Sequence, residues 1–384
     1  MWDVFIIINI ILFIALFGGY CLLIYKYENW FVRLKSFTPV NLNPATKFTI
    51  IIPARNEEDN IEKCILSILE NDYPKELYEI IVADDFSADS TADIVKKLHL
   101  AYPNVRLMQL ADHVSTKLNS YKKKAIEISI GKAANEWIIT TDADCTVPKQ
   151  WLSLYNAYIQ QSNAVFVAAP VMFTNSGSFI SIFQCLDFIS LQGITAASVS
   201  AGFHSMCNGA NLAYSKAAFT TVNGFKGVDD IASGDDMLLM HKISKQFPGK
   251  IGYLFSQAAI VSTPPMPNWK SFINQRIRWA SKATSYQDKR IFWVLLLVYL
   301  FNVYLFLLPF AAIFYPPFFI YWFMLLAGKT VCEMGFMKPV AKFFSRSKML
   351  WWFPVMQPFH IIYTVASGWL GKFGKYVWKE RVVK

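Results

Sequence analysis

Three stretches of the chain contain only uncharged, mostly apolar residues, and each is long enough to cross a membrane as a helix. Residues 4–25, 291–328 and 349–371 contain no Asp, Glu, Lys or Arg, and roughly 20 such residues span a bilayer. The first stretch is longer than the apolar core of a signal peptide, and no basic segment precedes it. We therefore predict a retained transmembrane anchor at the amino end.

The other two stretches differ in how they are predicted to meet the membrane. Tyr315-Pro316-Pro317 interrupts the second one, which predicts one helix before the break and another after it that includes Lys329 and Glu333. The third stretch has prolines and polar residues in its middle and basic clusters on both sides. Two cytoplasmic flanks favour a re-entrant or interfacial segment there, with a third span as the alternative.

Between the first two apolar stretches, short apolar runs alternate with amphipathic segments. The runs are β-branched and end in Pro, Asp or a loop, as strands buried on both faces do; they lie at residues 49–53, 79–83, 105–107 and 137–141. Segments with helical periodicity lie at residues 59–69, 90–100 and 121–134. This alternation predicts an α/β fold with a mostly parallel sheet flanked by helices.

These patterns divide the chain into four parts. We expect a transmembrane anchor, a linker, an α/β domain and a membrane region with a basic tail, at residues 1–27, 28–47, 48–290 and 291–384. Of the net charge of +10, the last part carries +8. Because these cations flank apolar helices, they are expected to face anionic lipid on the cytoplasmic side, and a nucleic-acid partner is excluded.

Composition narrows the class of protein further. With 54% hydrophobic and 17% charged residues, the chain is neither disordered nor purely soluble. Its six cysteines form no CxxC pair and no cluster with histidines at metal-ligand spacing. Neither a disulfide framework nor a zinc site is therefore expected.

Acidic residues follow three of the predicted strands. Asp142-Ala143-Asp144 comes directly after one strand, and two carboxylates at this spacing can share a divalent cation with a diphosphate. Pro53 to Glu58 and Asp84-Asp85 end two other strands. Helix caps and turns are the alternative explanation for part of this set. The carboxyl ends of parallel strands meet at one edge, so we expect a ligand site there.

Two further motifs lie later in the chain. Asp235-Asp236 begins a predicted helix, where the residues serve either as a general base or as an acidic first turn that the helix dipole favours. Gln275, Arg278 and Trp279 share one helical face directly before the membrane. This face suits phosphate and acceptor binding, and an interfacial anchor is the alternative.

Taken together, these motifs resemble the family 2 glycosyltransferases with the GT-A fold, in their membrane-bound branch with a QxxRW motif. The resemblance covers residues 48–280 and rests on residues 51–57, Asp84-Asp85, Asp142-Ala143-Asp144, Gly234-Asp235-Asp236 and Gln275-x-x-Arg278-Trp279. Asp235 replaces the glutamate that is usual in the family. Lys122 stands where the family often has a Gly-Lys pair, and a basic helix start is the alternative for it.

The resemblance implies a role for each matched residue. Those implied to bind the nucleotide sugar are Pro53, Arg55, Glu57, Val82, Asp84, Lys122, Asp142 and Ala143. Asp142 and Asp144 would hold Mg²⁺ or Mn²⁺, and Asp236 would be the catalytic base. The residues implied to contact the acceptor and the diphosphate are Asp235, Gln275, Arg278 and Trp279.

The function that the resemblance implies is inverting transfer of a single sugar from a nucleotide-diphosphate sugar to a membrane lipid. A UDP-sugar is favoured over a GDP-sugar as the donor. We expect an integral protein of the bacterial inner membrane with its catalytic domain in the cytoplasm. A processive polysaccharide synthase and a non-catalytic regulator that binds a nucleotide sugar or lipid are the alternatives.

Overall fold

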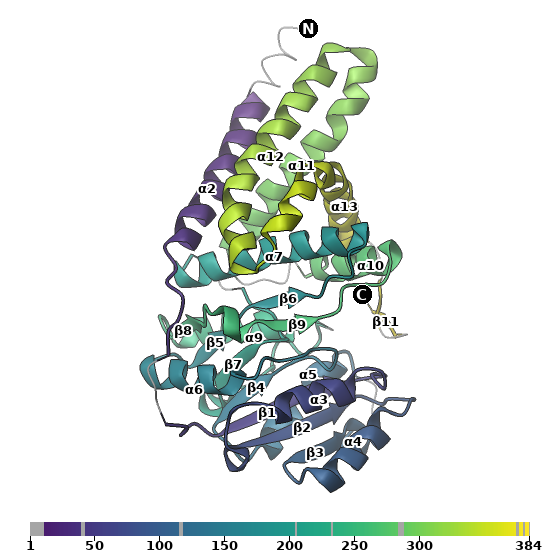
Figure 1. The fold of residues 1–384 in the computed structure, drawn as a ribbon. Coiled ribbons are helices and arrows are strands. Elements are labelled where there is room, and N and C mark those ends of the chain that lie inside the picture. Colours follow the sequence, from purple (N-terminus) through teal and green to yellow (C-terminus); the bar gives the residue numbers. More distant parts are fainter. Residues whose placement is uncertain are drawn as a thin grey trace.

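The computed structural model has an α/β part and a bundle of long helices, with α7 (Phe179–Ser200) and α10 (Trp269–Ala280) lying between them (Figure 1). The structure describes residues 11–39, 43–114, 118–203, 206–231, 233–282 and 288–373, together with the backbone of 376–378 and 381–383. The first residues of the predicted anchor at 4–25 lie outside this range. The described remainder is helical through η1 (Phe13–Gly18) and α2 (Gly19–Val32).

The central sheet has seven strands in the order β3-β2-β1-β4-β7-β5-β8. Their bounds are β1 Phe48–Ala54, β2 Tyr78–Asp84, β3 Val105–Gln109, β4 Trp137–Thr140, β5 Phe166–Ala168, β7 Leu212–Ser215 and β8 Ile251–Tyr253. The first four strands pair in parallel, while β7 runs antiparallel to both β4 and β5. The predicted mostly parallel sheet flanked by helices is confirmed.

Apolar side chains on both faces of the sheet explain why the strands form here. In β1, alternate residues belong to two cores: Ile51 packs into the core shared with the helical bundle, and Ile50 into the core on the other face. The helices of the α/β part are α3 Ile61–Leu69, α4 Thr91–Ala101, α5 Tyr121–Lys132, α6 Trp151–Gln161, α8 Lys216–Thr221 and α9 Asp235–Gln246. These helices cover the apolar side chains on the two faces of the sheet and so keep them out of water.

Short elements complete the α/β part and the carboxyl end. Two strands, β6 (Val171–Phe173) and β9 (Val261–Thr263), pair in parallel below α7. A hairpin is formed by β10 (Tyr376–Trp378) and β11 (Arg381–Val383). The single-turn helices are η2 Lys75–Leu77, η3 Leu110–Asp112 and η4 Gln257–Ala259, and η5 Ser347–Trp352 is slightly longer.

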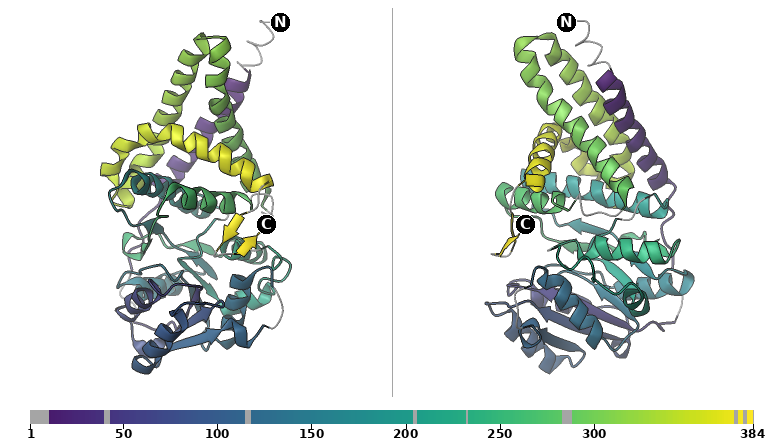
Figure 2. Two further views of the ribbon diagram at one scale, coloured as in Figure 1. Left: turned by 90° about the vertical axis from the view of Figure 1, so that its right-hand side faces the viewer. Right: turned by 180° about the vertical axis from the view of Figure 1, so that it is seen from behind.

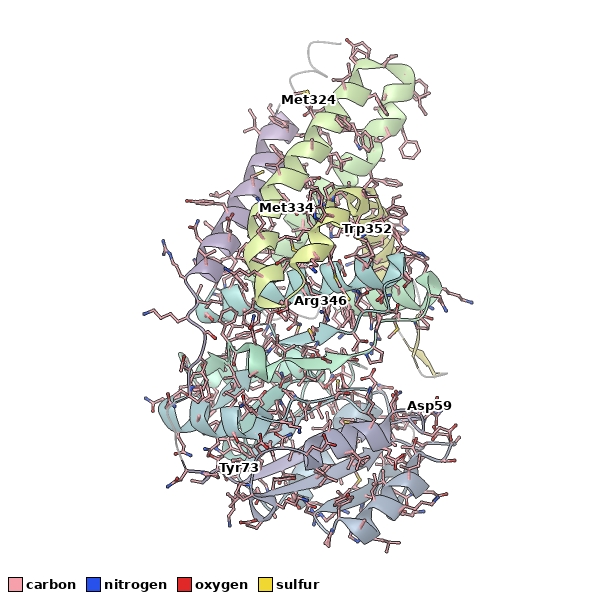
Figure 3. All side chains as sticks on the ribbon, in the orientation of Figure 1. Asp59, Tyr73, Met324, Met334, Arg346 and Trp352 are labelled. Carbon is pink, nitrogen blue, oxygen red and sulfur yellow. The ribbon has the colours of Figure 1, made fainter. Side chains whose placement is uncertain are left out.

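Two long apolar helices extend away from the sheet. α11 (Lys289–Phe314) and α12 (Pro317–Phe343) lie on the two sides of the predicted break, which is therefore confirmed. Both are long and apolar enough to cross a membrane. In Figure 3, Met324 lies in the half of the bundle far from the sheet and Arg346 lies at its base. We treat α11 and α12 as membrane-spanning segments.

α7 is a third helix with the length and hydropathy of a membrane span, but its surroundings differ. In the most apolar 18-residue segment of each helix, 72% is buried inside the protein for α7, compared with 28% for α11 and 11% for α12. It runs across the base of the bundle and contacts α2, α12 and α13 (Figure 1). The apolar character of α7 therefore reflects burial between the sheet and the bundle.

The third charge-free stretch forms α13 (Phe353–Phe373). Figure 2 shows α13 crossing beneath the bundle instead of running alongside α11 and α12. It packs against both α10 and α11. A re-entrant or interfacial position for this segment stays a prediction, and the crossing arrangement favours it.

Candidate active site

The parallel register of the sheet brings the predicted acidic strand ends to one edge. Ala54, at the end of β1, pairs with Asp84 of β2, and Ile51 pairs with Thr140 of β4. The loop that contains Asp142 and Asp144 therefore begins beside the end of β1. Such an edge is where open α/β sheets bind their ligands.

Lys122 connects two of the acidic motifs. It lies in the first turn of α5, and its Nζ atom is 2.8 Å from Oδ1 of Asp142 and 3.4 Å from Oδ2 of Asp235. Burial alone would lower the pKa of Lys122, but the two carboxylates outweigh burial and hold this pKa above its usual value. The structure thus places a charged lysine between the DxD loop and the start of α9.

The residues of the DxD loop fit a divalent cation that also binds a diphosphate. Burial, followed by the charges of Asp142 and Glu57, raises the pKa of Asp144 to about 6. A cation would relieve this repulsion between carboxylates. The described residues contain no group of three or more His, Cys, Asp or Glu at metal-binding distances. A site with two carboxylates, completed by water and phosphate oxygens, is usual for Mg²⁺.

Asp236 faces the same region from the first turn of α9. Gly234 precedes this helix with a φ of 78°, a conformation that suits glycine and turns the chain into the helix. Oδ2 of Asp236 accepts a hydrogen bond from the N–H of Gly209 at 2.9 Å, and Oδ1 accepts one from the N–H of Met237 at 2.7 Å. These two backbone contacts fix the orientation of the carboxylate.

The pKa values of the two adjacent carboxyl groups of α9 shift in opposite directions. Burial and the charge of Asp235 raise the pKa of Asp236. Burial acts on Asp235 in the same direction, but Lys122 and Lys282 outweigh it and lower the pKa of Asp235. Neighbouring groups with separated pKa values are typical of acid–base sites. The direction of these two shifts makes Asp236, and not Asp235, the group better suited to accept a proton.

Some of the residues predicted to bind the nucleotide line the cavity at this edge of the sheet, and others do not. Arg55 donates hydrogen bonds to the carbonyl oxygens of Asp85 and Phe86, at 2.8 and 3.0 Å. Val82 is fully buried and Asp84 is 3% exposed, and neither is among the described residues that line the cavity. Asp85 does line it. Asp85 is as buried as Asp84, and the nucleotide-binding role of Asp84 stays a prediction.

A single large cavity joins this acidic edge to the helical bundle. Its volume is about 1240 Å³. From the α/β part, the predicted residues that line it are Pro53, Arg55, Glu57, Lys122, Asp142, Ala143, Asp144, Asp235 and Asp236. From α10 it is lined by Gln275, Arg278 and Trp279, and from the bundle by residues such as Tyr20, Tyr299, Glu333, Met337 and Thr364.

Sequence reasoning missed several residues of this site. Lys282 lines the cavity; its charge helps to lower the pKa of Asp235 and partly offsets the rise that burial and Asp235 cause in the pKa of Asp236. Asp187, on α7, forms an ion pair with Arg276 of α10 at 2.5 Å. Asp187 could have been found in the sequence because it is a lone carboxylate within an apolar helical segment. Arg276 could have been found because it lies between the motif residues Gln275 and Arg278.

Comparisons with known proteins identify the family. The model of glycosyl transferase family 2 matches residues 49–203, and that of glycosyl transferase family group 2 matches residues 137–370. Glycosyltransferase AglE of Haloferax volcanii is 30% identical over 126 residues, which is 33% of this chain and 40% of that protein. Probable glycosyltransferase YdaM of Bacillus subtilis is 26% identical over 249 residues, 62% of this chain and 56% of YdaM. The chain thus spans about half the length of these relatives.

A lipid-modifying relative and a solved structure add to this picture. The beta-monoglucosyldiacylglycerol synthase of Synechocystis is 28% identical over 109 residues, 28% of this chain and 22% of that protein. The mannosyltransferase PcManGT of Pyrobaculum calidifontis, solved with GDP-Man and Mn²⁺, matches 91% of this chain and 98% of its own. With a TM-score of 0.58 and 19% identity, that match shows a shared fold. Because the second family model spans more than half of the sequence, this chain belongs to the family 2 glycosyltransferases.

Proposed function

We propose that this protein transfers a single sugar from a nucleotide-diphosphate sugar to a hydroxyl group of a membrane lipid, with inversion at the anomeric carbon. The observation that supports this most is the cavity, because it runs from the acidic sheet edge into the helical bundle. A hydrophilic donor could bind at one end while the lipid enters from the other. A UDP-sugar is the first donor to test, and GDP-sugars are the second.

Asp236 is the proposed base. Its carboxylate is held by the N–H groups of Gly209 and Met237, which leaves its position independent of the substrate. In the proposed step, the acceptor oxygen bonds to the anomeric carbon while the bond from that carbon to the diphosphate breaks. Asp236 takes the proton of the acceptor hydroxyl, and the nucleoside diphosphate leaves with the electron pair.

The leaving diphosphate needs positive charge around it. Asp142 and Asp144 would hold Mg²⁺ or Mn²⁺, which supplies Lewis-acid stabilisation of phosphate oxygens when bound. Arg278 and Lys282 line the same cavity and are further cations for this purpose. Gln275 and Trp279 are proposed to contact the acceptor, with the indole ring packing against it.

We further propose that the α/β part lies on the cytoplasmic side of the bacterial inner membrane, with domain bounds as predicted from the sequence. Lys342, Arg346 and Lys348 gather where α12 ends near the sheet. Positive residues favour the cytoplasmic side, which supports this orientation. One relative, the beta-monoglucosyldiacylglycerol synthase of Synechocystis, is named for a glycolipid product.

A radiolabelled transfer assay tests the proposal. Purified full-length protein in lipid nanodiscs is incubated with UDP- or GDP-linked sugars, a total lipid extract and Mn²⁺. We expect one labelled lipid product, and we expect it to disappear in Asp236→Asn but not in Asp93→Asn, an exposed carboxylate on α4. A ladder of products would instead indicate a processive synthase. Nucleotide-sugar binding without transfer to any lipid would indicate a non-catalytic regulator.

A further inference from the structure

The cavity wall formed by α10 is held by a buried ion pair between Arg276 and Asp187, and Asp187 itself lines the cavity. Arg276 is 4% exposed and Asp187 is 8% exposed. Nε and Nη2 of Arg276 lie 3.1 and 2.5 Å from the same carboxylate oxygen, Oδ2 of Asp187. The other oxygen of Asp187 accepts a hydrogen bond from the hydroxyl of Tyr363. This cluster therefore connects α7, α10 and α13.

Arg276 also contacts two of the residues proposed to bind the acceptor. Its Nη1 atom donates a hydrogen bond to Oε1 of Gln275 at 2.8 Å. Its guanidinium carbon lies 4.2 Å from the ring centre of Trp279, and Phe272 lies at 4.5 Å on the same helix. One buried cation thus fixes an amide and an indole that both line the cavity.

A buried ion pair is a poor way to gain stability, because two charges must lose their hydration. A planar guanidinium is, however, well suited to holding several groups at fixed angles. Here it hydrogen-bonds a carboxylate and an amide and stacks on an indole. The cluster is therefore better explained by geometry than by stability.

We propose that Asp187, Arg276 and Tyr363 form a positioning clamp that orients Gln275 and Trp279 toward the acceptor and joins this wall to α13. The inference rests on the proposed function, in which α10 borders the acceptor site. None of the three residues needs to touch the reacting atoms. Loss of the clamp should therefore impair use of the acceptor far more than donor binding, because of the proposed donor-side residues only Arg278 lies on α10.

The packing of α10 on α13 supports this link. A Cβ atom added to Gly371 of α13 would lie 2.8 Å from Cβ of Ala280 of α10. The two helices therefore approach each other closely near their C-terminal ends. Tyr363 is on the same helix as Gly371, about two turns earlier. Any shift of α13 relative to α10 is therefore transmitted through Tyr363 to Asp187 and Arg276.

Arg276→Lys is the first test, because it keeps the charge and removes both the planar fork and most of the stacking. Tyr363→Phe removes a single hydroxyl and is the milder variant should Arg276→Lys fold poorly. Arg106→Lys is the matched control: Arg106 pairs with Glu79 at 2.9 Å on the far strands of the sheet. Lipid transfer, donor binding and amide hydrogen exchange of residues 269–280 are measured on the full-length proteins in nanodiscs.

We expect kcat/KM for the lipid to fall on the order of 10²-fold in Arg276→Lys and about tenfold in Tyr363→Phe, because misplacement by about 1 Å has costs of this size. Donor affinity should stay within about threefold. Adding Asp187→Asn to Arg276→Lys should cost little more than the worse single change, since the residues act as one unit. Exchange in residues 269–280 should rise in these variants and not in Arg106→Lys.

Two results would overturn the clamp. One is an equal loss of donor affinity and lipid transfer, which would make Arg276 a general stability residue. The other is unchanged exchange in residues 269–280 in Arg276→Lys. The exchange experiment does not depend on transfer, so it tests the clamp even if the wild-type protein glycosylates no lipid and the proposed function fails.

Discussion

Replacing Asp236 with asparagine should separate binding from chemistry. The substitution keeps the size of the side chain and removes the proton acceptor. General-base catalysis contributes about 10²- to 10⁴-fold, which corresponds to about 2.7–5.4 kcal/mol of barrier. We expect turnover to fall by this factor. Nucleotide affinity should stay within about threefold, because the proposed donor residues lie on or after β1, β2 and β4 and in the first turn of α5, and none of them lies on α9.

The structure also sets the cost of this change to the fold. Both carboxylate oxygens of Asp236 accept backbone N–H groups, one from Gly209 and one from Met237. An amide can accept only one of these, and its NH₂ group must then face the other N–H. The loss of one such contact costs about 1–3 kcal/mol of folding free energy. The variant should therefore be less stable but folded.

The assay compares two quantities on the same preparation of full-length protein. Titration calorimetry with the nucleoside diphosphate gives the donor-site Kd, and radiolabelled transfer under saturating substrates gives kcat. Asp93→Asn serves as the control for adding an amide at a carboxylate position. If Kd rises by the same factor as kcat falls, Asp236 is only a helix-terminus residue, and the assignment of the base is refuted.

Three further predictions concern charges in and near the cavity. Asp144→Ala should lose at least 10²-fold in turnover, and EDTA should reduce the wild-type rate equally without further effect on the variant. Asp236 accepts a proton only when it is deprotonated, so its raised pKa shifts the acid limb of the kcat/KM profile to higher pH. Asp235→Asn removes a like charge beside Asp236 and should therefore shift that limb to lower pH. Lys329 lies 2.7 Å from Glu333 within the bundle, and Lys329→Met should destabilise the protein by about 3–5 kcal/mol. A paired Glu333→Gln change should recover part of the thermal stability in the same detergent.

The sequence by itself determined the elements that depend on local pattern. A β-branched run such as residues 49–53 can be buried only as a strand between two layers, and β1 forms there. Two consecutive prolines interrupt a membrane helix; α11 ends at Phe314, and α12 begins at the second proline, Pro317. The acidic residues after β1, β2 and β4 gather because parallel strands in register end at one edge.

Packing decided two features of the fold that the sequence patterns left unassigned. α7 has the hydropathy of a membrane span but is enclosed between the sheet and the bundle. β7 inserts antiparallel between β4 and β5, a placement that no local periodicity encodes. Apolar composition fixes how much surface must be buried, whereas the partner that buries it depends on the whole chain.

The polar contacts of the site were decided only by tertiary structure. Asp187 and Arg276 are 89 positions apart in the chain, and nothing in either local sequence pairs them. Lys122 sits between Asp142 and Asp235 because α5 and α9 both begin at the same sheet edge. A buried charge needs a partner wherever the fold can supply one, so sequence predicts the need while the three-dimensional arrangement selects the partner.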